Sequence, residues 1–450
     1  MENAAVPSGS GSDDLCQKAE RMIPRHRPPF RMAALTASML PGFGPRSVEQ
    51  LEQDYADTLN VPHAIWLPSA RYGICQAIDF GLGSQDRVYC PAFTCKVVHQ
   101  AIRRSGRTME LVDCNDNSLL MDTRFLQTQL GPDRQPPQTT SADGRRNIRG
   151  YGVVLSEVFG HRYPNLDGLP LLRNAGLRIF DMAMCIPTAR DMQRLVDRDV
   201  ALLSFGLGKS LYAGWGGMAF TKDDWMADRL REQRDQDLRA NTKVANVRQV
   251  AKVWLRTFAH SAWLYKLSRR LVESRSSVSS DNSNPLSAES ELLTPEWSNA
   301  PTTFHLKLAA ENLKQSASFS RDRLEYAEIY RSELDHLTHD AAPGTEGWLT
   351  LLADSQAALS HFCLRSSLRD PLRQYLWLKG IDTSVLFPFP EGADSNQLQN
   401  THRLTLQIIG LPLSNGLGSQ NIRRICSLIR DFIATEYAAS NRPHVSRNAA

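Results

Sequence analysis

The amino-acid sequence predicts an α/β fold in which helices cover a largely parallel β-sheet. Short apolar runs alternate with helical patterns of apolar residues through the first half of the chain. Such alternation is typical of units in which a helix crosses the sheet between two parallel strands. The length of 450 residues is enough for two or three structural units. The expected strands are His63–Leu67, Arg87–Cys90, Thr108–Val112, Tyr151–Glu157, Arg178–Asp181, Val200–Phe205 and Gly217–Phe220.

Changes in composition divide the chain into five segments. The N-terminus is rich in Ser, Gly and Pro, and order is expected from Ser47, which has with Gln50 the spacing of a capping box. Helical, charged sequence begins at Asp223, and a Ser- and Asn-rich linker follows it. A polar loop is expected over 131–148. The predicted segments are a flexible arm (1–30), a large α/β domain (31–222), a helical insertion with a polar linker (223–300), a smaller C-terminal α/β domain (301–436) and a flexible tail (437–450).

The composition excludes several classes of protein. A net charge of +4 without clustered Lys and Arg argues against a nucleic-acid partner. The eight cysteines show no CxxC spacing, so neither a metal site nor a disulfide framework is indicated, and a cytoplasmic location is favoured. No apolar stretch reaches the roughly 18 residues of a membrane span. The N-terminus also lacks the apolar core of a secretory signal.

The most informative stretch is DVALLSFGLGKSLYAGWGGMAF, residues 199–220. An apolar strand ends at Ser204, a glycine-flanked turn presents Lys209, and a Gly-rich segment leads into the next strand. Desolvation favours the neutral amine of a lysine, which is the form that an imine-forming nucleophile needs. The alternative is a surface lysine in a glycine-rich loop. The spacing does not match a Walker A loop, so a P-loop is disfavoured.

Two other strand ends carry candidate ligand-binding residues. Asp181 ends a strand, where open α/β sheets bind their ligands, and a carboxylate there would keep a pyridine nitrogen protonated. Ser69, Ala70 and Arg71 stand between a strand and a helix, where free amides and the helix dipole bind phosphate. For both Asp181 and Ser69 the alternative interpretation is a plain helix N-cap.

Together these pieces resemble the DegT/DnrJ/EryC1/StrS family of sugar aminotransferases, which depend on pyridoxal 5'-phosphate (PLP). The resemblance runs from about Ser47 to Phe432. Its strongest motif is Ser204-Phe205-x-x-x-Lys209 followed by Gly-Trp-Gly-Gly. Supporting pieces are PSARYGI (68–74), RVYCPAFT (87–94), LVD (111–113), EVFGHRYPNLDG (157–168), FDMA (180–183) and IIGLPLSNGL (408–417).

The resemblance implies a fold-type I transferase in which Lys209 forms the internal aldimine with PLP and shuttles a proton between the substrate Cα and the cofactor. It also implies that Asp181 pairs with the pyridinium nitrogen and that Ser204, with the 69–71 loop, holds the phosphate. The reaction implied is transfer of an amino group from glutamate or glutamine to a nucleotide-linked keto sugar, in polysaccharide or amino-sugar biosynthesis. A homodimer with active sites at the subunit interface is expected.

Four positions depart from the family pattern. Cys95 stands where an aromatic residue usually stacks on the cofactor ring, although Phe93 is an alternative stacking partner. Met184 stands where Gln or His contacts the cofactor or substrate, Ser210 replaces a common Asn, and Trp215 replaces a small or acidic residue. The residues expected to anchor the cofactor are kept, whereas those expected to face the substrate differ from the family pattern. A catalytically divergent, PLP-binding or regulatory homologue is therefore the alternative function.

The segment 243–275 adds a hypothesis about location. It is basic and carries interleaved aromatic and aliphatic residues, with Glu273 as its lone acidic residue. Basic amphipathic helices can make weak contacts with anionic membrane surfaces. The alternative is that its apolar face packs on its own domain or on the dimer partner.

Overall fold

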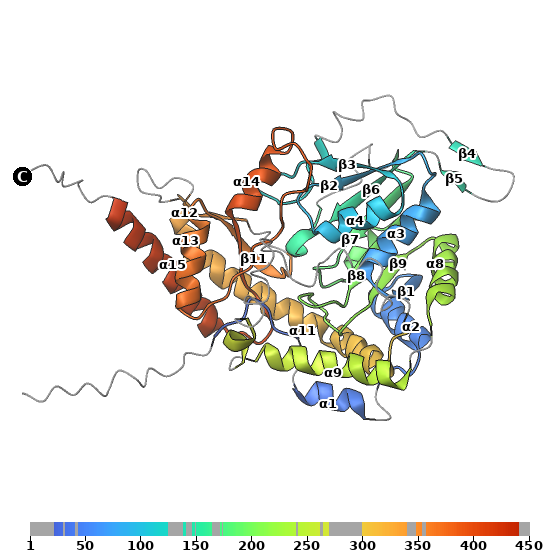
Figure 1. The fold of residues 1–450 in the computed structure, drawn as a ribbon, viewed down its shortest axis with the longest axis horizontal. Coiled ribbons are helices and arrows are strands. Elements are labelled where there is room, and N and C mark those ends of the chain that lie inside the picture. Colours follow the sequence, from blue (N-terminus) through green and yellow to red (C-terminus); the bar gives the residue numbers. More distant parts are fainter. Residues whose placement is uncertain are drawn as a thin grey trace, which may run out of the picture.

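The computed structural model describes residues 22–29, 32–40, 44–124, 138–140, 146–148, 150–163, 172, 174–239, 242–261, 264–269, 299–339, 348–352 and 357–440. A seven-stranded sheet and a three-stranded sheet lie side by side, with helices around both (Figure 1). The predicted α/β class with a mostly parallel, helix-covered sheet is confirmed. No helix of this described part is long and apolar enough to cross a membrane.

The seven-stranded sheet has the order β1-β9-β8-β7-β6-β2-β3. Neighbours from β8 to β3 run parallel, whereas β9 is antiparallel to both β8 and β1. The carboxyl ends of six strands therefore share one edge with the amino end of β9. Each strand begins and ends within one residue of the predicted bounds: β1 (His63–Leu67), β2 (Arg87–Pro91), β3 (Thr108–Val112), β6 (Tyr151–Ser156), β7 (Leu177–Asp181), β8 (Asp199–Ser204) and β9 (Gly217–Thr221).

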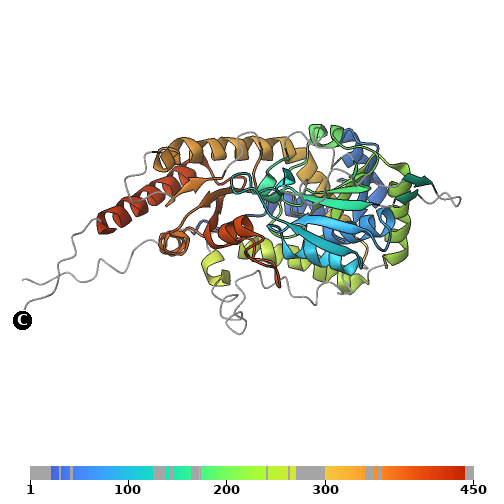
Figure 2. The ribbon, with the colours of Figure 1, turned by 90° about the horizontal axis from the view of Figure 1, so that it is seen from above.

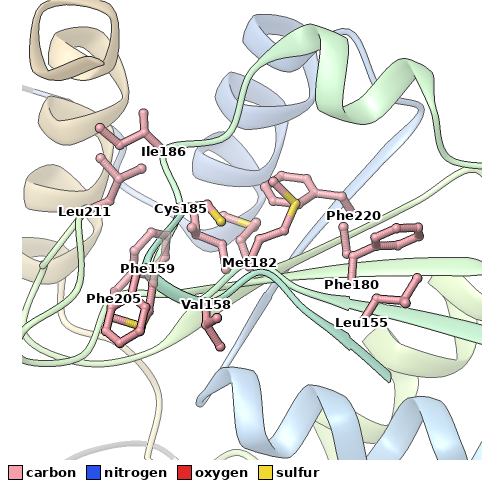
Figure 3. Close-up of a cluster of buried hydrophobic side chains, with 14 of the residues drawn as sticks. Leu155, Val158, Phe159, Phe180, Met182, Cys185, Ile186, Phe205, Leu211 and Phe220 are labelled. Atoms are coloured by element: carbon pink, nitrogen blue, oxygen red, sulfur yellow. The ribbon is translucent and has the colours of Figure 1, made fainter. Parts of the chain in front are cut away.

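Side chains of both faces of this sheet are buried, because helices cover each face. Along β1, Ile65 and Leu67 enter one apolar core, and Ala64 and Trp66 enter the other. Figure 3 shows part of the second core, in which Phe180, Met182 and Phe220 are labelled. The first core contains residues of α3 (Ala70–Gly81), α4 (Lys96–Arg104) and α8 (Asp224–Asp237), and the second contains residues of α2 (Val48–Leu59) and the first half of α11 (Thr303–Leu334).

The C-terminal part builds a separate core on an antiparallel sheet of order β10-β11-β12. The second half of α11 contributes to this core, so the long helix joins the two sheets (Figures 1 and 2). The elements are β10 (Thr350–Leu351), β11 (His361–Arg365), β12 (Ile408–Pro412), α12 (His336–His339), α13 (Arg369–Leu378), α14 (Gln399–Gln407) and α15 (Ser419–Ser440).

The structure differs from the sequence-based expectation at both ends of the chain and in one loop. Residues 1–30 were expected to be a flexible arm, but Met22 and Ile23 are buried. The Ile23 amide donates to the Gly380 carbonyl at 2.8 Å, and the Ile23 carbonyl accepts from Asp382 at 2.9 Å. Helix α15 continues beyond the expected start of the tail at 437. The expected polar loop 131–148 contains a short antiparallel pair, β4 (Gln138–Thr140) and β5 (Arg146–Ile148).

The insertion is helical, as its composition predicts. After α8 comes α9 (Lys243–Ala259), which runs along one edge of the molecule (Figures 1 and 2). The predicted polar linker over 274–290 lies outside the described residues. The remaining elements are α1 (Met32–Met39), the single turn η1 (Val158–Gly160) and α7 (Ala189–Gln193).

A buried ion pair ties the first residues of β8 to β7. Arg178 Nε and Nη2 each donate to the Asp199 carboxylate at 2.6 Å, and the two side chains are only 4% and 0% exposed. Removing one partner of such a pair leaves a buried charge without compensation. We expect Arg178→Met to lower the free energy of unfolding by about 3–5 kcal/mol, measured by urea denaturation.

The matched control is the double variant Arg178→Met/Asp199→Leu, which replaces both charges by apolar side chains. It should recover most of the lost stability. Equal stability of the single variant and the unaltered protein would show that the pair does not hold these strands together.

Candidate active site

Gly217 fixes the geometry of the sheet edge where the predicted site residues gather. It pairs with Ser204 of β8 on one side and with Leu67 of β1 on the other. A Cβ at this position would lie 2.4 Å from the Leu203 carbonyl oxygen and 3.0 Å from the Ala70 amide nitrogen. Only glycine permits this approach. Since neighbouring strands lie about 4.8 Å apart, Ser204 and Leu67 lie about 10 Å from each other on the two sides of Gly217, and the Ala70 amide approaches Gly217 between them.

The start of α3 has the form expected of an anion-binding turn. Ser69 adopts an extended backbone, and its Oγ accepts a hydrogen bond from the Tyr72 amide at 3.0 Å. The first helical bond of this turn runs from the Gly73 amide to the Ser69 carbonyl. The amides of Ala70 and Arg71 precede it, so they are among the donors that a helix cannot satisfy internally. The predicted N-cap at Ser69 is therefore present, and it is compatible with a phosphate at the same helix end.

The turn that carries Lys209 is closed by main-chain bonds. The Phe205 amide donates to the Gly216 carbonyl at 2.9 Å, and the Phe205 carbonyl accepts from Ala213 at 3.0 Å. At the start of the turn the Gly206 amide donates to Ser204 Oγ at 3.3 Å. Lys209 is half-buried, and among the described residues no side chain within hydrogen-bonding distance holds its amine. The contacts of the described residues therefore close the turn but do not hold the Lys209 amine.

Asp181 lies at the carboxyl end of β7, within electrostatic reach of Lys209. Burial raises the pKa of its carboxyl group, while the charge of Lys209, the Ala183 amide and the Ser156 hydroxyl act in the opposite direction. The Ala183 amide donates to Asp181 Oδ1 at 3.1 Å. Thr94 Oγ1 donates in turn to Ser156 Oγ at 3.0 Å, and both hydroxyls are buried. Three groups therefore favour an anionic carboxylate in a place where burial opposes it.

The sequence did not single out Ser156 and Thr94. A signal was nevertheless present, because Ser156 ends the strand beside Asp181 and Thr94 ends the RVYCPAFT motif. Parallel strands bring such ends together at one edge of a sheet. Ser and Thr are common at strand ends for many other reasons, so their position alone did not mark them.

Two substrate-side positions lie next to these anchors. Cys95 is half-buried and precedes α4, with no side-chain bond that caps the helix. Phe93, the alternative stacking residue, is buried and packs edge-on against Phe387 with ring centres 5.5 Å apart. Met184 is also buried, and its carbonyl accepts from Ser210 Oγ at 2.8 Å. Trp215, another position that departs from the family pattern, packs against the rings of Trp66 and His305.

Three histidines from distant parts of the chain meet beside the Lys209 turn. The His26 ring packs edge-on against His361 at 5.6 Å and stacks on His260 at 6.4 Å. A Cβ on Gly208, which has a φ of +76°, would lie 3.2 Å from His26 Nε2. Burial and nearby arginines lower the pKa of all three rings, that of His361 to about 3. They are therefore neutral near pH 7, and the periodic pattern of the sequence gave no indication of their meeting.

A buried arginine connects the long helix to the same turn. Arg323 of α11 donates through Nη1 to Ser210 Oγ at 2.8 Å and to the Leu359 carbonyl at 3.2 Å. Its Nε donates to Asn415 Oδ1 at 3.2 Å. Burial lowers the pKa of Arg323 to about 10, so the guanidinium keeps its charge near pH 7. It holds the residue that follows Lys209 against the C-terminal sheet.

These residues fit PLP. A carboxylate supported by three groups suits a pyridinium nitrogen, and a lysine amine on a closed turn suits a covalent attachment to an aldehyde. The amides at the start of α3 suit a phosphate, because they are donors that the helix does not use internally. Within the described ranges, no group of three His, Cys, Asp or Glu side chains could hold a metal ion.

Comparisons with known proteins show the family and the fold of the chain. Residues 33–259 match the model of the DegT/DnrJ/EryC1/StrS aminotransferase family. The spore coat polysaccharide biosynthesis protein SpsC of Bacillus subtilis (strain 168) is 25% identical over 228 residues, which are 50% of this chain and 51% of SpsC. The match therefore spans about half of that relative. The dTDP-3-amino-3,4,6-trideoxy-alpha-D-glucose transaminase of Streptomyces venezuelae is 22% identical over 399 residues, 86% of each protein.

Solved structures show the same fold. The structure of S. venezuelae DesV in complex with a ketimine intermediate has a TM-score of 0.61 at 20% identity and covers 89% of this chain and 93% of DesV. The sugar aminotransferase CalS13 from Micromonospora echinospora has a TM-score of 0.60 at 17% identity and covers 91% of this chain and 100% of CalS13. The predicted fold-type I architecture is confirmed. With half of its residues matched by the family model, the chain belongs to the DegT/DnrJ/EryC1/StrS aminotransferase family, whose cofactor is PLP.

Proposed function

We propose that this chain transfers an amino group from glutamate or glutamine to a nucleotide-linked keto sugar, with Lys209 as the residue that attaches PLP. The observation that carries the proposal is the meeting of the Lys209 turn, Asp181 and the start of α3 at one edge of the sheet. The names of the two curated relatives, one a polysaccharide biosynthesis protein and one an amino-sugar transaminase, support a sugar as the acceptor.

In this proposal the cofactor is held at both of its ends. The phosphate would lie between Ser204 and the residues Ser69, Ala70 and Arg71, with the dipole of α3 favouring its charge. Asp181 would pair with the pyridine nitrogen and keep it protonated, since an opposite charge favours the charged form. Bound there, PLP supplies an electron sink for the bond that breaks at the substrate Cα.

The remaining chemistry belongs to side chains of the protein. Lys209 Nζ would take the proton from Cα of the amino donor and return it on the product side, as a positioned general base and acid. Ser156 and Ala183 would keep Asp181 anionic through their hydrogen bonds. Arg323 would act as a positioning residue, because it holds Ser210 and so limits the movement of Lys209.

The proposal places sulfur-bearing side chains on the substrate side of the site. Cys95 and Met184 would contact the cofactor at positions where relatives carry aromatic and amide or imidazole groups. Neither side chain offers a strong hydrogen-bond donor. We infer that they shape the pocket and leave polar recognition of the sugar to other residues.

We also propose a cytoplasmic homodimer with its active sites at the subunit interface. The described cysteines are all free and mostly buried, which suits a reducing compartment. Sedimentation of the purified protein tests the dimer, because a monomer at micromolar concentration would remove that part of the proposal.

The first prediction concerns Lys209. The purified full chain with PLP should show a visible absorbance band that borohydride bleaches, and Lys209→Ala should lack that band. We expect Lys209→Ala to lower kcat at least about 10²-fold, the smallest effect usual for a general acid–base group. Activity is measured by mass spectrometry of a panel of nucleotide keto sugars with glutamate or glutamine.

Lys314→Ala, which removes an exposed lysine of α11, is the matched control and should leave both band and activity unchanged. A colourless protein that ignores added PLP would overturn the enzyme function. A band that persists in Lys209→Ala would move the attachment to another lysine. A coloured protein without turnover on any acceptor would favour the divergent, PLP-binding homologue.

The second prediction follows from the raised pKa of Asp181. Burial disfavours the ionised carboxylate in the folded state. The contribution of Asp181 to the free energy of unfolding of the cofactor-free protein therefore falls as the pH rises through that pKa. Asp181→Asn removes the penalty. We expect the variant to have the higher Tm at pH 8, and the difference to vanish near pH 3.5, where Asp is largely protonated in the unfolded chain too.

Thermal unfolding of the cofactor-free proteins at both pH values is the measurement. A lower Tm of Asp181→Asn at pH 8 would mean that Lys209, Ser156 and Ala183 outweigh burial. The same variant should bind PLP more weakly than the unaltered protein, because the amide cannot pair with a pyridinium as a carboxylate does.

A further inference from the structure

Helix α9 exposes a continuous apolar stripe on its outer side. Val244, Val247, Leu255 and Phe258 are 78%, 69%, 70% and 47% exposed. Their spacing, completed by the exposed Ala251, places them on one face of the helix. Single exposed apolar side chains are ordinary on a protein surface, but a contiguous patch of them marks an interaction site.

The opposite side of α9 packs against the rest of the same chain. Val253 is the one α9 side chain classed as buried in the described structure. A Cβ on Gly214 would lie 2.7 Å from Val253 Cγ2, so the inner side of α9 packs closely on the turn that follows Lys209. The outer stripe is therefore not the face that attaches α9 to its own domain.

Positive charges flank the stripe. From Thr242 to Arg269 the sequence contains six Lys or Arg residues and no Asp or Glu. At about 100° per residue, Lys243 lies on one side of the stripe and Arg248 and Lys252 lie on the other. The following short helical turn continues the character of the patch, because Leu264, Lys266 and Leu267 are also exposed.

A second copy of the chain is a poor occupant for this face. A two-fold interface places the same patch of both copies opposite each other. Here it would bring two rows of cations together, and no acidic residue of the patch could compensate them. An anionic lipid surface would accommodate both the apolar stripe and the cations that flank it. Apolar side chains enter the boundary of the acyl chains, while Lys and Arg attract the headgroups.

We propose that the outer face of α9, with the turn at 264–267, binds the surface of anionic membranes. The contact is peripheral, and it does not depend on the proposed reaction.

The test is flotation of the full chain, loaded with PLP, on vesicles of phosphatidylcholine alone or with 30 mol% phosphatidylserine, a composition chosen at about the level that gives a strongly negative surface. We expect binding only to the anionic vesicles, and weaker binding as salt is raised from about 50 to 500 mM. Val247→Ser/Leu255→Ser should weaken binding at least about tenfold by removing apolar burial. Lys243→Gln/Arg248→Gln should weaken it about 25-fold, about fivefold for each charge.

Two matched controls remove exposed groups elsewhere: Leu378→Ser on α13, where the side chain is 75% exposed, and Lys314→Gln on α11. Both should bind vesicles like the unaltered protein. Absence of flotation with anionic vesicles, or equal flotation of all variants, would overturn the proposal. Conversion of a dimer to a monomer by Val247→Ser/Leu255→Ser, seen by sedimentation, would assign the stripe to a second copy instead.

Discussion

The reversal of the chain between β8 and β9 is the constraint on which the site depends. Because β9 runs against both of its neighbours, its first residue meets the carboxyl ends of β8 and β1 at once. The turn between the two strands must then lie beyond that edge, and it carries Lys209 there. Gly217 makes the arrangement possible, since any Cβ would collide with the Leu203 carbonyl oxygen. One glycine thus sets the distance between the lysine turn and the start of α3.

Much of the large sheet could be predicted from the sequence, because the relevant information is local. Apolar runs of five or six residues between helical patterns define each parallel strand, and strand ends in such a sheet share one edge. Lys209, Asp181 and Ser69 could therefore be placed together before the structure was known. Their roles toward PLP, in contrast, rest on the family resemblance and remain to be tested.

The junction with the C-terminal sheet could not be predicted, because it is built from contacts between distant segments. His26, His260 and His361 are separated by more than 100 residues along the chain, and none belongs to a periodic pattern that points to the others. The N-terminal segment looks flexible by composition, yet backbone bonds from Ile23 add it to the C-terminal part. Main-chain pairing of this kind leaves no trace in composition. The β4–β5 pair was not predicted either, because its main-chain pairing also leaves no trace in the composition.

The electrostatics of the junction follow from burial beside fixed positive charges. Burial, with the charges of Arg323, Arg25 and Lys209, lowers the pKa of His361. A protonated imidazole there would place another cation among buried positive charges. The neutral ring instead has a hydroxyl at each nitrogen, Ser360 Oγ and Ser384 Oγ, both at 3.1 Å. This choice of partners keeps the junction from adding another positive charge beside Lys209.

Trp215, which departs from the family pattern, lies next to Gly214, the residue at which the Lys209 turn packs against helix α9. Trp215 packs with a tilted ring against His305 at the start of α11, while a Cβ on the neighbouring Gly214 would meet both His305 and Val253 of α9. The turn that presents Lys209 is thus packed directly against the helix whose outer face carries the apolar stripe. A force or displacement at α9 would reach the turn through Gly214 without crossing the sheet. Trp215 and α9 therefore both pack around the Lys209 turn, Trp215 through the ring of His305 and α9 through Val253 beside Gly214. At position 184 the contact with this turn is made by the main chain, because Ser210 Oγ donates to the Met184 carbonyl.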